Sequence, residues 1–225
     1  MLKILGKEEY IKYRSLFQRL SLEMEGINYV LDCPWIWDNA NIKKEDTVLD
    51  VGCGGGGLGL LAAKYCKQLC GIDRENYPRY YETCKKFNVN NAKFIISNAE
   101  NPMPFDDNFF DVVISVSALE HNNLDEMPVE NNPVNRAVRE IYRVLKKGGL
   151  FVATVAVSPE GGYFSSEQQI LELFLSGTNF KLLDDSGLTG WKRESPEVST
   201  ILKDFLAVYD SYQNWLPVGI ILKKG

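Results

Sequence analysis

Residues 48–57 have the sequence VLDVGCGGGG, in which an apolar run ends in a carboxylate and a glycine cluster follows at once. This order is typical of a buried parallel strand that enters a tight turn, where a ligand can approach the backbone. Residues 58–65, LGLLAAKY, then predict a helix whose N-terminus faces the same place. The stretch therefore predicts a nucleotide-type binding turn between a strand and a helix.

The glycine pattern by itself leaves the ligand open. Gly52, Gly54 and Gly57 fit the dinucleotide pattern GxGxxG, which is weak evidence alone. Asp50, two residues before the first glycine, suits a cationic ligand and would repel a pyrophosphate packed on the turn. A second apolar stretch ends in Asp73, at about the place where a ribose-binding carboxylate is expected. The two carboxylates shift the balance away from a dinucleotide.

With these residues in place, the chain resembles the class I S-adenosylmethionine-dependent methyltransferases, most closely their small-molecule (type 11-like) group. Five motifs carry the resemblance in the family's order, and they lie at residues 48–56, 71–73, 97–100 with 104–105, 110–115 with 118–121, and 139–150. The resemblance covers roughly residues 46–157, about half of the chain. It departs from the family at Asn98, where an acid is usual, and in the long acidic segment 122–132.

The resemblance and the alternation of apolar segments imply an α/β fold, a Rossmann-like, doubly wound and mostly parallel seven-stranded sheet with helices on both faces. The expected strands are 47–51, 69–73, 92–96, 110–116, 150–157, 179–185 and 217–223, and the resemblance makes one of the last two antiparallel. The expected helices are 57–66, 76–87, 133–146, 165–175 and 197–210. An N-terminal helical extension precedes them, with an amphipathic helix over 8–24 and a loop or short helix over 28–40, where Pro34 limits regular helix. We therefore divide the chain into a helical and aromatic cap, 1–45, and a methyltransferase region, 46–225, within one domain overall.

The resemblance implies S-adenosylmethionine as the cofactor and S-adenosylhomocysteine as the product. Asp50 would anchor the methionyl amino group, and Asp73 would accept hydrogen bonds from both ribose hydroxyls. Asn98 would bind the adenine edge, with the backbone of Ala99 beside it. The other expected cofactor contacts are Gly52, Cys53, Gly54, Gly56, Arg74 and Ser115. The alternatives are structural: a turn-capping acid at Asp50, an N-cap at Asp73 and a satisfied core hydroxyl at Ser115.

His121, the only histidine, follows Glu120 after the fourth strand of the motif set and is the candidate general base. A hydrogen-bonded structural histidine is the alternative. Tyr29, Trp35 and Trp37 are candidates for a substrate wall, although aromatic clusters are more often core. Two further residues are assigned to the pocket, Glu120, which could instead hold a loop, and Tyr163, which follows the fifth strand.

Composition limits the remaining classes. A net charge of −5 argues against tight nucleic-acid binding, which needs a basic patch. No apolar run reaches the roughly 18 residues of a membrane span, and the N-terminus lacks a secretory signal. Five cysteines without a CxxC pair indicate reduced thiols and no metal site. The expectation is a cytoplasmic protein that binds neither nucleic acid nor membrane, with its oligomeric state open.

The leading hypothesis is transfer of the cofactor's methyl group to a small-molecule acceptor by in-line displacement. A non-catalytic S-adenosylmethionine-binding scaffold or partner protein is the alternative, and its sign would be a spoiled first motif. A nicotinamide-linked oxidoreductase would want an apolar residue where Asp50 stands. The sequence does not identify the acceptor.

Overall fold

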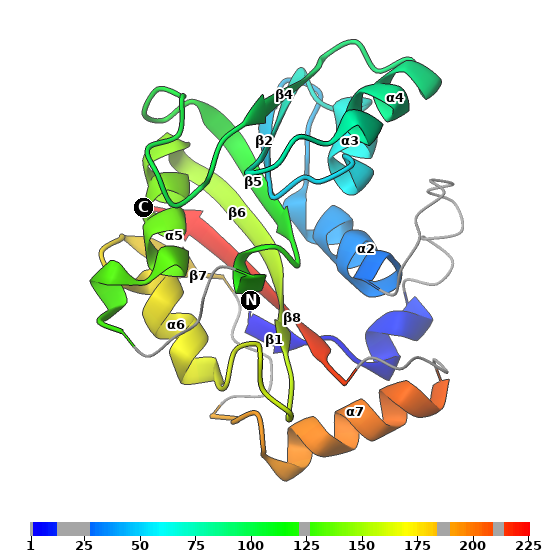
Figure 1. Ribbon diagram of the computed structural model, residues 1–225, viewed down its shortest axis with the longest axis vertical. Helices are drawn as coiled ribbons and strands as arrows, with labels where there is room; N and C mark the ends of the chain where they lie inside the picture. The colour runs from blue at the N-terminus through cyan, green and yellow to red at the C-terminus, as the bar shows by residue number, and fades with distance from the viewer. Residues whose placement is uncertain (1, 13–27, 122–126, 184–189, 209–213) are drawn as a thin grey trace.

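The computed structural model describes residues 2–12, 28–121, 127–183, 190–208 and 214–225. Its centre is one sheet with helices on both sides (Figure 1). The strands are β1 (Leu2–Ile4), β2 (Thr47–Val51), β3 (Gln68–Asp73), β4 (Ala92–Ile96), β5 (Phe110–Val116), β6 (Leu145–Val157), β7 (Phe180–Leu182) and β8 (Leu216–Lys224). The helices are α2 (Asn28–Ala40), α3 (Gly57–Ala63), α4 (Pro78–Lys86), α5 (Pro133–Val144), α6 (Glu167–Leu175) and α7 (Pro196–Val208), with short 3₁₀ turns η1 (Leu119–His121) and η2 (Val129–Asn131).

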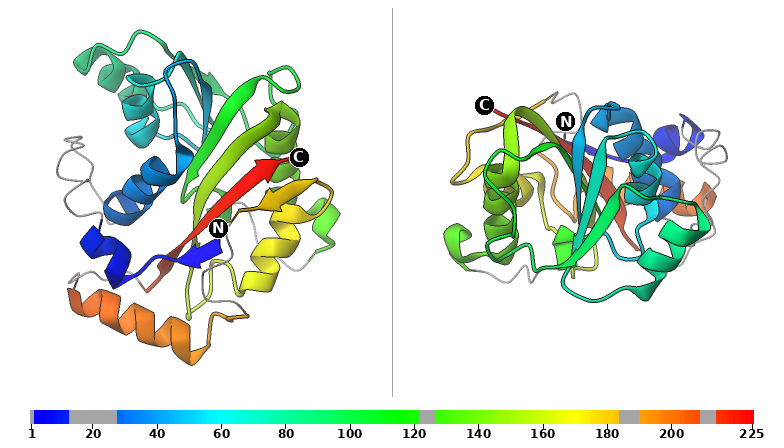
Figure 2. Two further views of the ribbon diagram at one scale, coloured as in Figure 1. Left: turned by 180° about the vertical axis from the view of Figure 1, so that it is seen from behind. Right: turned by 90° about the horizontal axis from the view of Figure 1, so that it is seen from above.

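The strand order is β4-β3-β2-β5-β6-β8, in which β2 to β6 run parallel and β8 runs antiparallel to β6. The predicted Rossmann-like sheet is confirmed, including the antiparallel strand at its end. All seven predicted strands are present, and the described residues add an eighth, β1. Because β6 occupies one edge of β8, β1 and β7 share the other edge, β1 opposite 218–220 and β7 opposite 222–224 (Figure 2).

Some predicted boundaries were wrong. α5 ends at Val144 rather than 146, and the chain is already extended from Leu145, five residues before the predicted strand. The pairing with β5 is irregular between Phe110 and Val112, which accommodates the turn at Gly148 and Gly149. Of the predicted helix over 8–24, residues 8–12 are helical and the rest lies outside the described residues.

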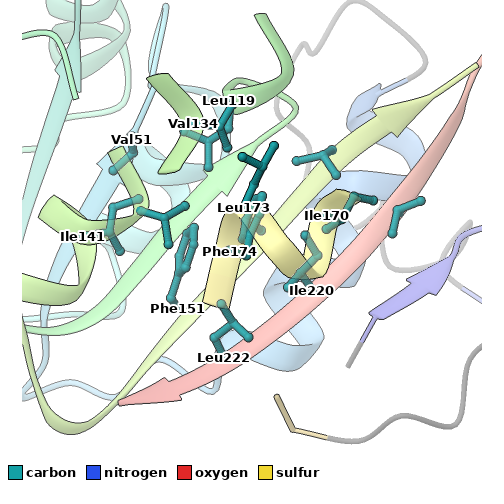
Figure 3. Close-up of a cluster of buried hydrophobic side chains, with 14 of the residues drawn as sticks. Val51, Leu119, Val134, Ile141, Phe151, Ile170, Leu173, Phe174, Ile220 and Leu222 are labelled. Carbon is teal, nitrogen blue, oxygen red and sulfur yellow. The ribbon is translucent and has the colours of Figure 1, made fainter. Parts of the chain in front are cut away.

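Two hydrophobic cores fill the two faces of the sheet. On one face, α5 and α6 pack against β6 and β8 through residues such as Ile141, Phe151 and Phe174 (Figure 3). On the other, α2 and α3 pack against the sheet through Trp35, Leu60 and Ile114 among others. The parallel strands are buried on both sides, which explains their near-continuous apolar sequence.

The segment 28–40 corrects the sequence analysis, because it is a thirteen-residue helix, α2, rather than a loop or short helix. Pro34 lies inside it and donates no backbone hydrogen bond, a cost that packing offsets. Leu31, Trp35 and Ile36 are buried, and α2 contacts β5, β6 and β8. Tertiary packing therefore overrides the local signal. β1 and α2 both come from the predicted cap, and both are joined to the sheet.

The contact between α2 and β8 predicts a stability effect. A Cβ atom at Gly219 would meet three ring atoms of Trp35 at 2.5–2.7 Å, and Trp35 is fully enclosed. We expect Gly219→Ala to lower the free energy of unfolding by about 2 kcal/mol through overpacking, measured by urea denaturation. Gly55→Ala is the control, since its Cβ would lie 3.4 Å from a flexible Arg79 side chain. Equal stability of the two variants would contradict this account.

Candidate active site

The carboxyl ends of β2 and β3 present the two predicted carboxylates at one edge of the sheet. β2 pairs in parallel with β3, so Asp50 and Asp73 end neighbouring strands. The turn after β2 is tied to β3, because the backbone amides of Gly52 and Cys53 both donate to the Ile72 carbonyl, at 2.9 and 3.0 Å. Gly52 has a φ of +72°, and a Cβ there would lie 2.3 Å from that of Ala118. The glycine is therefore required by conformation and by space.

Asp73 is held in a fixed orientation by the backbone. The Gly54 amide donates to Oδ2 at 3.0 Å, and the Glu75 amide donates to Oδ1 at 3.2 Å. Each carboxylate oxygen keeps further acceptor capacity. The Ser97 amide donates to the Asp73 carbonyl at 2.8 Å, which brings the end of β4 to the same edge. This geometry suits a two-point contact with a diol.

Asp50 is buried beneath the glycine turn against α3. A Cβ at Gly59 would lie 2.2 Å from Asp50 Oδ2, so the helix approaches the carboxylate closely only because Gly59 has no side chain. Burial, and then the charge of Asp73, raise the pKa of Asp50 to about 7, while a hydrogen bond from the Gly59 amide opposes the shift. A cationic group beside Asp50 would restore its ionisation. The residue is thus built to meet a positive charge.

Two adjoining cavities lie on either side of the glycine turn. The first, here the Asp73 cavity, encloses about 210 Å³, and its lining includes Asp73, Arg74, Asn98, Ala99 and His121. The second, the Asp50 cavity, encloses about 190 Å³, and its lining includes Asp50, Cys53, Gly57 and Leu58. Gly52, Gly54 and Ser117 line both cavities. The two cavities adjoin at these three residues and are together called the trough, and a carboxylate lines each half.

Asn98 and Ala99, the predicted adenine-side residues, both line the Asp73 cavity. Asn98 Oδ1 accepts from the Glu100 amide at 3.1 Å, so its side chain is held in a local turn. The amide nitrogen of Asn98 then remains as its donor group. Arg74 is exposed at the rim, 4.0 Å from Glu75 in an ion pair.

Several predicted site residues lie elsewhere. Ser115 is fully buried and donates to the Val51 carbonyl at 3.0 Å, which is the satisfied core hydroxyl of the alternative. Gly56 caps α3 with a φ of +95° and lines neither cavity. Trp35 packs in the core over Gly219, and Trp37 stacks edge-on with Tyr65 at 5.1 Å. The side chain of Tyr29 lies outside the described residues.

The residues after β5 take three different positions. His121 is exposed and lines the Asp73 cavity. Its ring lies 6.1 Å from that of Tyr163, edge to face, so Tyr163 stands next to the cavity without lining it. Glu120 is buried, and its Oε1 accepts from the Ala156 amide at 3.2 Å, which ties η1 to the end of β6. Glu120 thus holds a loop, as one of its two interpretations had it.

The trough also contains residues that sequence reasoning missed. Tyr77, just before α4, lines the Asp73 cavity, and burial together with the charges of Asp73 and Glu75 raises its pKa. Only its place four residues after Asp73 could have indicated it. Ser117, the residue directly after β5, lines both cavities and has a φ of +42°, an uncommon conformation for a residue with a side chain. No local sequence signal marks that conformation.

The described residues contain no group of three or more His, Cys, Asp or Glu side chains able to hold a metal ion. Within the same residues, no helix is both long and apolar enough to cross a membrane. The cysteines among them are unpaired, and burial raises the pKa of Cys53 and Cys70 thiols, which makes poor nucleophiles of both.

A parallel sheet with an acid at the end of two neighbouring strands and a glycine turn between them defines a protein that binds a nucleoside-type cofactor. Comparison with known proteins gives the family. Residues 49–153 match a family model described as a methyltransferase domain. The ubiquinone biosynthesis O-methyltransferase of Pseudomonas paraeruginosa is 30% identical over 170 residues, which cover 72% of this chain and 68% of that protein. The chain belongs to the class I S-adenosylmethionine-dependent methyltransferases, and S-adenosylmethionine is its cofactor.

Other relatives agree on the fold. The uncharacterized methyltransferase YcgJ of Bacillus subtilis is 28% identical over 184 residues, 80% of this chain and 64% of that protein. Its crystal structure superposes with a TM-score of 0.61 at 20% identity, over 86% of this chain and 98% of that one. A geranyl diphosphate C-methyltransferase structure from Streptomyces coelicolor, with Mg²⁺, geranyl diphosphate and S-adenosyl-L-homocysteine, gives a TM-score of 0.60 at 15% identity, over 100% of this chain and 91% of that one. The chain thus spans about two thirds of the length of the two sequence relatives.

Proposed function

We propose that this protein transfers the methyl group of S-adenosylmethionine to a small-molecule acceptor. The observation that carries the proposal is the trough itself, with Asp73 fixed by two backbone amides in one half and buried Asp50 in the other. The cofactor has matching ends, a ribose diol and a methionyl ammonium group. The names of the relatives support a small-molecule acceptor, since they include a ubiquinone biosynthesis O-methyltransferase and sterol 24-C-methyltransferases.

In this proposal each residue of the trough acts by binding and orienting the cofactor. Asp50 receives the methionyl ammonium group, and Asp73 receives the ribose hydroxyls. Asn98 and the backbone of Ala99 face the adenine edge. Gly52 and Gly54 let the ligand approach the backbone. Fixing the cofactor and the acceptor in line lowers the barrier by proximity and orientation.

The bound cofactor supplies an electrophilic methyl carbon, because that carbon is attached to a sulfonium. The chain therefore needs to place the acceptor and to take up any proton it loses. His121 lines the Asp73 cavity and Tyr163 lies beside it, so we assign the acceptor to the space around them. Glu120 contributes by fixing the loop that carries His121.

The first test is titration calorimetry of the purified protein with S-adenosylmethionine, S-adenosylhomocysteine and NAD in parallel. We expect micromolar binding of the two sulfur compounds and none of NAD. A screen with methyl-labelled cofactor then follows over phenols, amines, thiols and carbon acids. Failure to bind either sulfur compound would contradict the proposal. Binding without transfer to any acceptor would favour the non-catalytic scaffold.

His121→Gln tests the base. If His121 Nδ1 or Nε2 accepts the acceptor's proton, kcat should fall by about 10²-fold, because glutamine keeps the polarity and loses the basic nitrogen. The affinity for S-adenosylmethionine should stay unchanged, since the cofactor contacts lie elsewhere in the trough. Steady-state kinetics with an acceptor from the screen, together with calorimetry, measures both. Normal turnover across pH would remove His121 as the base.

A further inference from the structure

Three polar side chains from distant parts of the chain meet beneath the trough. Asp32 lies in α2, Ser117 directly follows β5, and Glu120 lies in η1. Ser117 Oγ donates to Asp32 Oδ2 at 2.7 Å. Asp32 is fully buried and Glu120 is 3% exposed, yet Asp32 Oδ1 and Glu120 Oε2 find no hydrogen-bond partner in the part of the chain that the structure describes. Ser117 has one hydroxyl proton, which it donates to Asp32, and the Glu120 carboxyl group also faces this hydroxyl.

No positive charge balances this cluster within the described residues. Their ion pairs include neither Asp32 nor Glu120. Among the described residues, the titratable groups that face Asp32 are Glu120 and the Cys33 thiol, and Cys33 in turn faces Asp50; none of these groups carries a positive charge. Buried, uncompensated carboxylates are costly to a fold. A ligand that carries a positive charge would offset this cost when it binds.

The place of Ser117 indicates which cation that is. Gly52, Gly54 and Ser117 line both halves of the trough, so they mark the junction between them. In S-adenosylmethionine the sulfonium joins the ribose to the methionyl chain. With the ribose at Asp73 and the amino group at Asp50, the sulfonium lies at this junction. Of Gly52, Gly54 and Ser117, only Ser117 has a side chain. Its hydroxyl donates a hydrogen bond to Asp32. Its oxygen therefore has only lone pairs left for a ligand.

We propose that the cluster of Asp32, Ser117 and Glu120 reads the charge on the cofactor's sulfur, binding the sulfonium of S-adenosylmethionine more tightly than the neutral thioether of S-adenosylhomocysteine. The inference rests on the proposed function, because it uses the placement of the cofactor in the trough. Methyl transfer removes the positive charge from the sulfur, so the attraction to the cluster is lost. S-adenosylhomocysteine therefore dissociates more readily than S-adenosylmethionine.

Protonation of the cluster gives a second, independent prediction. Burial raises the pKa of both Asp32 and Glu120 above the ordinary carboxyl range. As the pH falls, the pair gains protons and loses negative charge, so the preference for the sulfonium form should shrink. Asp50 also has a raised pKa, but both ligands carry the same methionyl amino group. Below about pH 7 this group is an ammonium in both ligands, so the protonation of Asp50 weakens both alike and cancels in the ratio of their affinities.

The experiment measures that ratio by calorimetry in the full chain, with S-adenosylmethionine and S-adenosylhomocysteine as the probes. Asp32→Asn keeps an oxygen acceptor for Ser117 and removes the charge. We expect it to reduce the preference for S-adenosylmethionine by about five- to tenfold, and Glu120→Gln to reduce it in the same direction. Asp46→Asn is the matched control, because Asp46 is also buried but precedes β2 at the opposite end of the sheet. It should leave the ratio unchanged.

The outcomes separate the two proposals. If the wild-type protein binds neither ligand, the proposed function fails. If it binds both, and Asp32→Asn leaves the ratio as it was, the charge-reading inference alone fails. Should Asp32→Asn not fold, the wild-type ratio at pH 5.5 and pH 7 decides, since both ligands keep their ammonium group in this range and a purely structural cluster predicts no change of preference between the two values.

Discussion

Asp73→Ala is expected to weaken the binding of S-adenosylmethionine by about 10²- to 10⁴-fold. The proposed contact is a pair of hydrogen bonds from the ribose hydroxyls to one carboxylate, and each hydrogen bond to a charged group contributes about 1.5–3 kcal/mol. The Gly54 and Glu75 amides already fix this carboxylate, at 3.0 and 3.2 Å. The Asp73 side chain therefore loses little conformational entropy when the ligand binds, and most of the hydrogen-bond energy should contribute to the affinity.

Glu75→Ala is the matched control for this change. It removes one negative charge next to the trough, but the Glu75 side chain is 66% exposed and its backbone amide still donates to Asp73. Its effect on affinity should stay within about threefold, as expected for a solvent-screened charge. Calorimetry measures both variants, and thermal unfolding checks that both fold. Equal affinities of the two variants would overturn the assignment of Asp73.

Much of this fold follows from local pattern. The sequence of residues 48–57 predicts β2, the turn and the start of α3. An apolar run, an acid at its end and a glycine cluster each favour a particular local structure. The same holds for Asp50 and Asp73, whose places at strand ends follow from sequence alone. Parallel strands share an edge for their carboxyl ends, so the sequence predicts that the two acids meet there.

The features that could not be predicted depend on contacts between residues far apart in the sequence. β1 has three residues and pairs with a strand more than 200 residues away, so no local period could reveal it. α2 forms despite Pro34 because its buried face packs on three strands. Trp35 and Trp37 are both suitable residues for a substrate wall, yet Trp35 is buried in the core, Trp37 is half-buried against Tyr65, and neither lines the trough. Aromatic residues serve both purposes, and composition cannot separate the two.

The polar cluster beneath the trough shows the same limit for function. Asp32 and Ser117 are 85 residues apart in sequence and 2.7 Å apart in the structure. Asp32 alone resembles any acid in an amphipathic helix, and Ser117 resembles any serine after a strand. Their meaning depends on the contact of α2 with β5, which only the folded chain displays.

Lys224→Met is expected to lower the free energy of unfolding by about 3 kcal/mol. Lys224 Nζ donates to the carbonyls of Tyr142 and Leu145 at 2.6 and 2.7 Å and to Asn108 Oδ1 at 2.9 Å. It also lies 4.4 Å from the centre of the Tyr142 ring. These carbonyls belong to the end of α5, where the last carbonyl groups of a helix have no amide donor within the helix. One buried ammonium group thus satisfies the helix terminus and ties it to β8.

Methionine keeps the length and the apolar stem of the lysine but donates no hydrogen bond, so the carbonyls would remain buried without a partner. Desolvation lowers the pKa of Lys224, which shows how far the ammonium group is withdrawn from water. Lys223→Met, on the exposed neighbour, should change stability by less than about 0.5 kcal/mol. Urea denaturation of the two variants gives the comparison. If both lose the same small amount, Lys224 is an ordinary surface charge, and the end of α5 is held by the apolar contacts of Ile141 and Val144 alone.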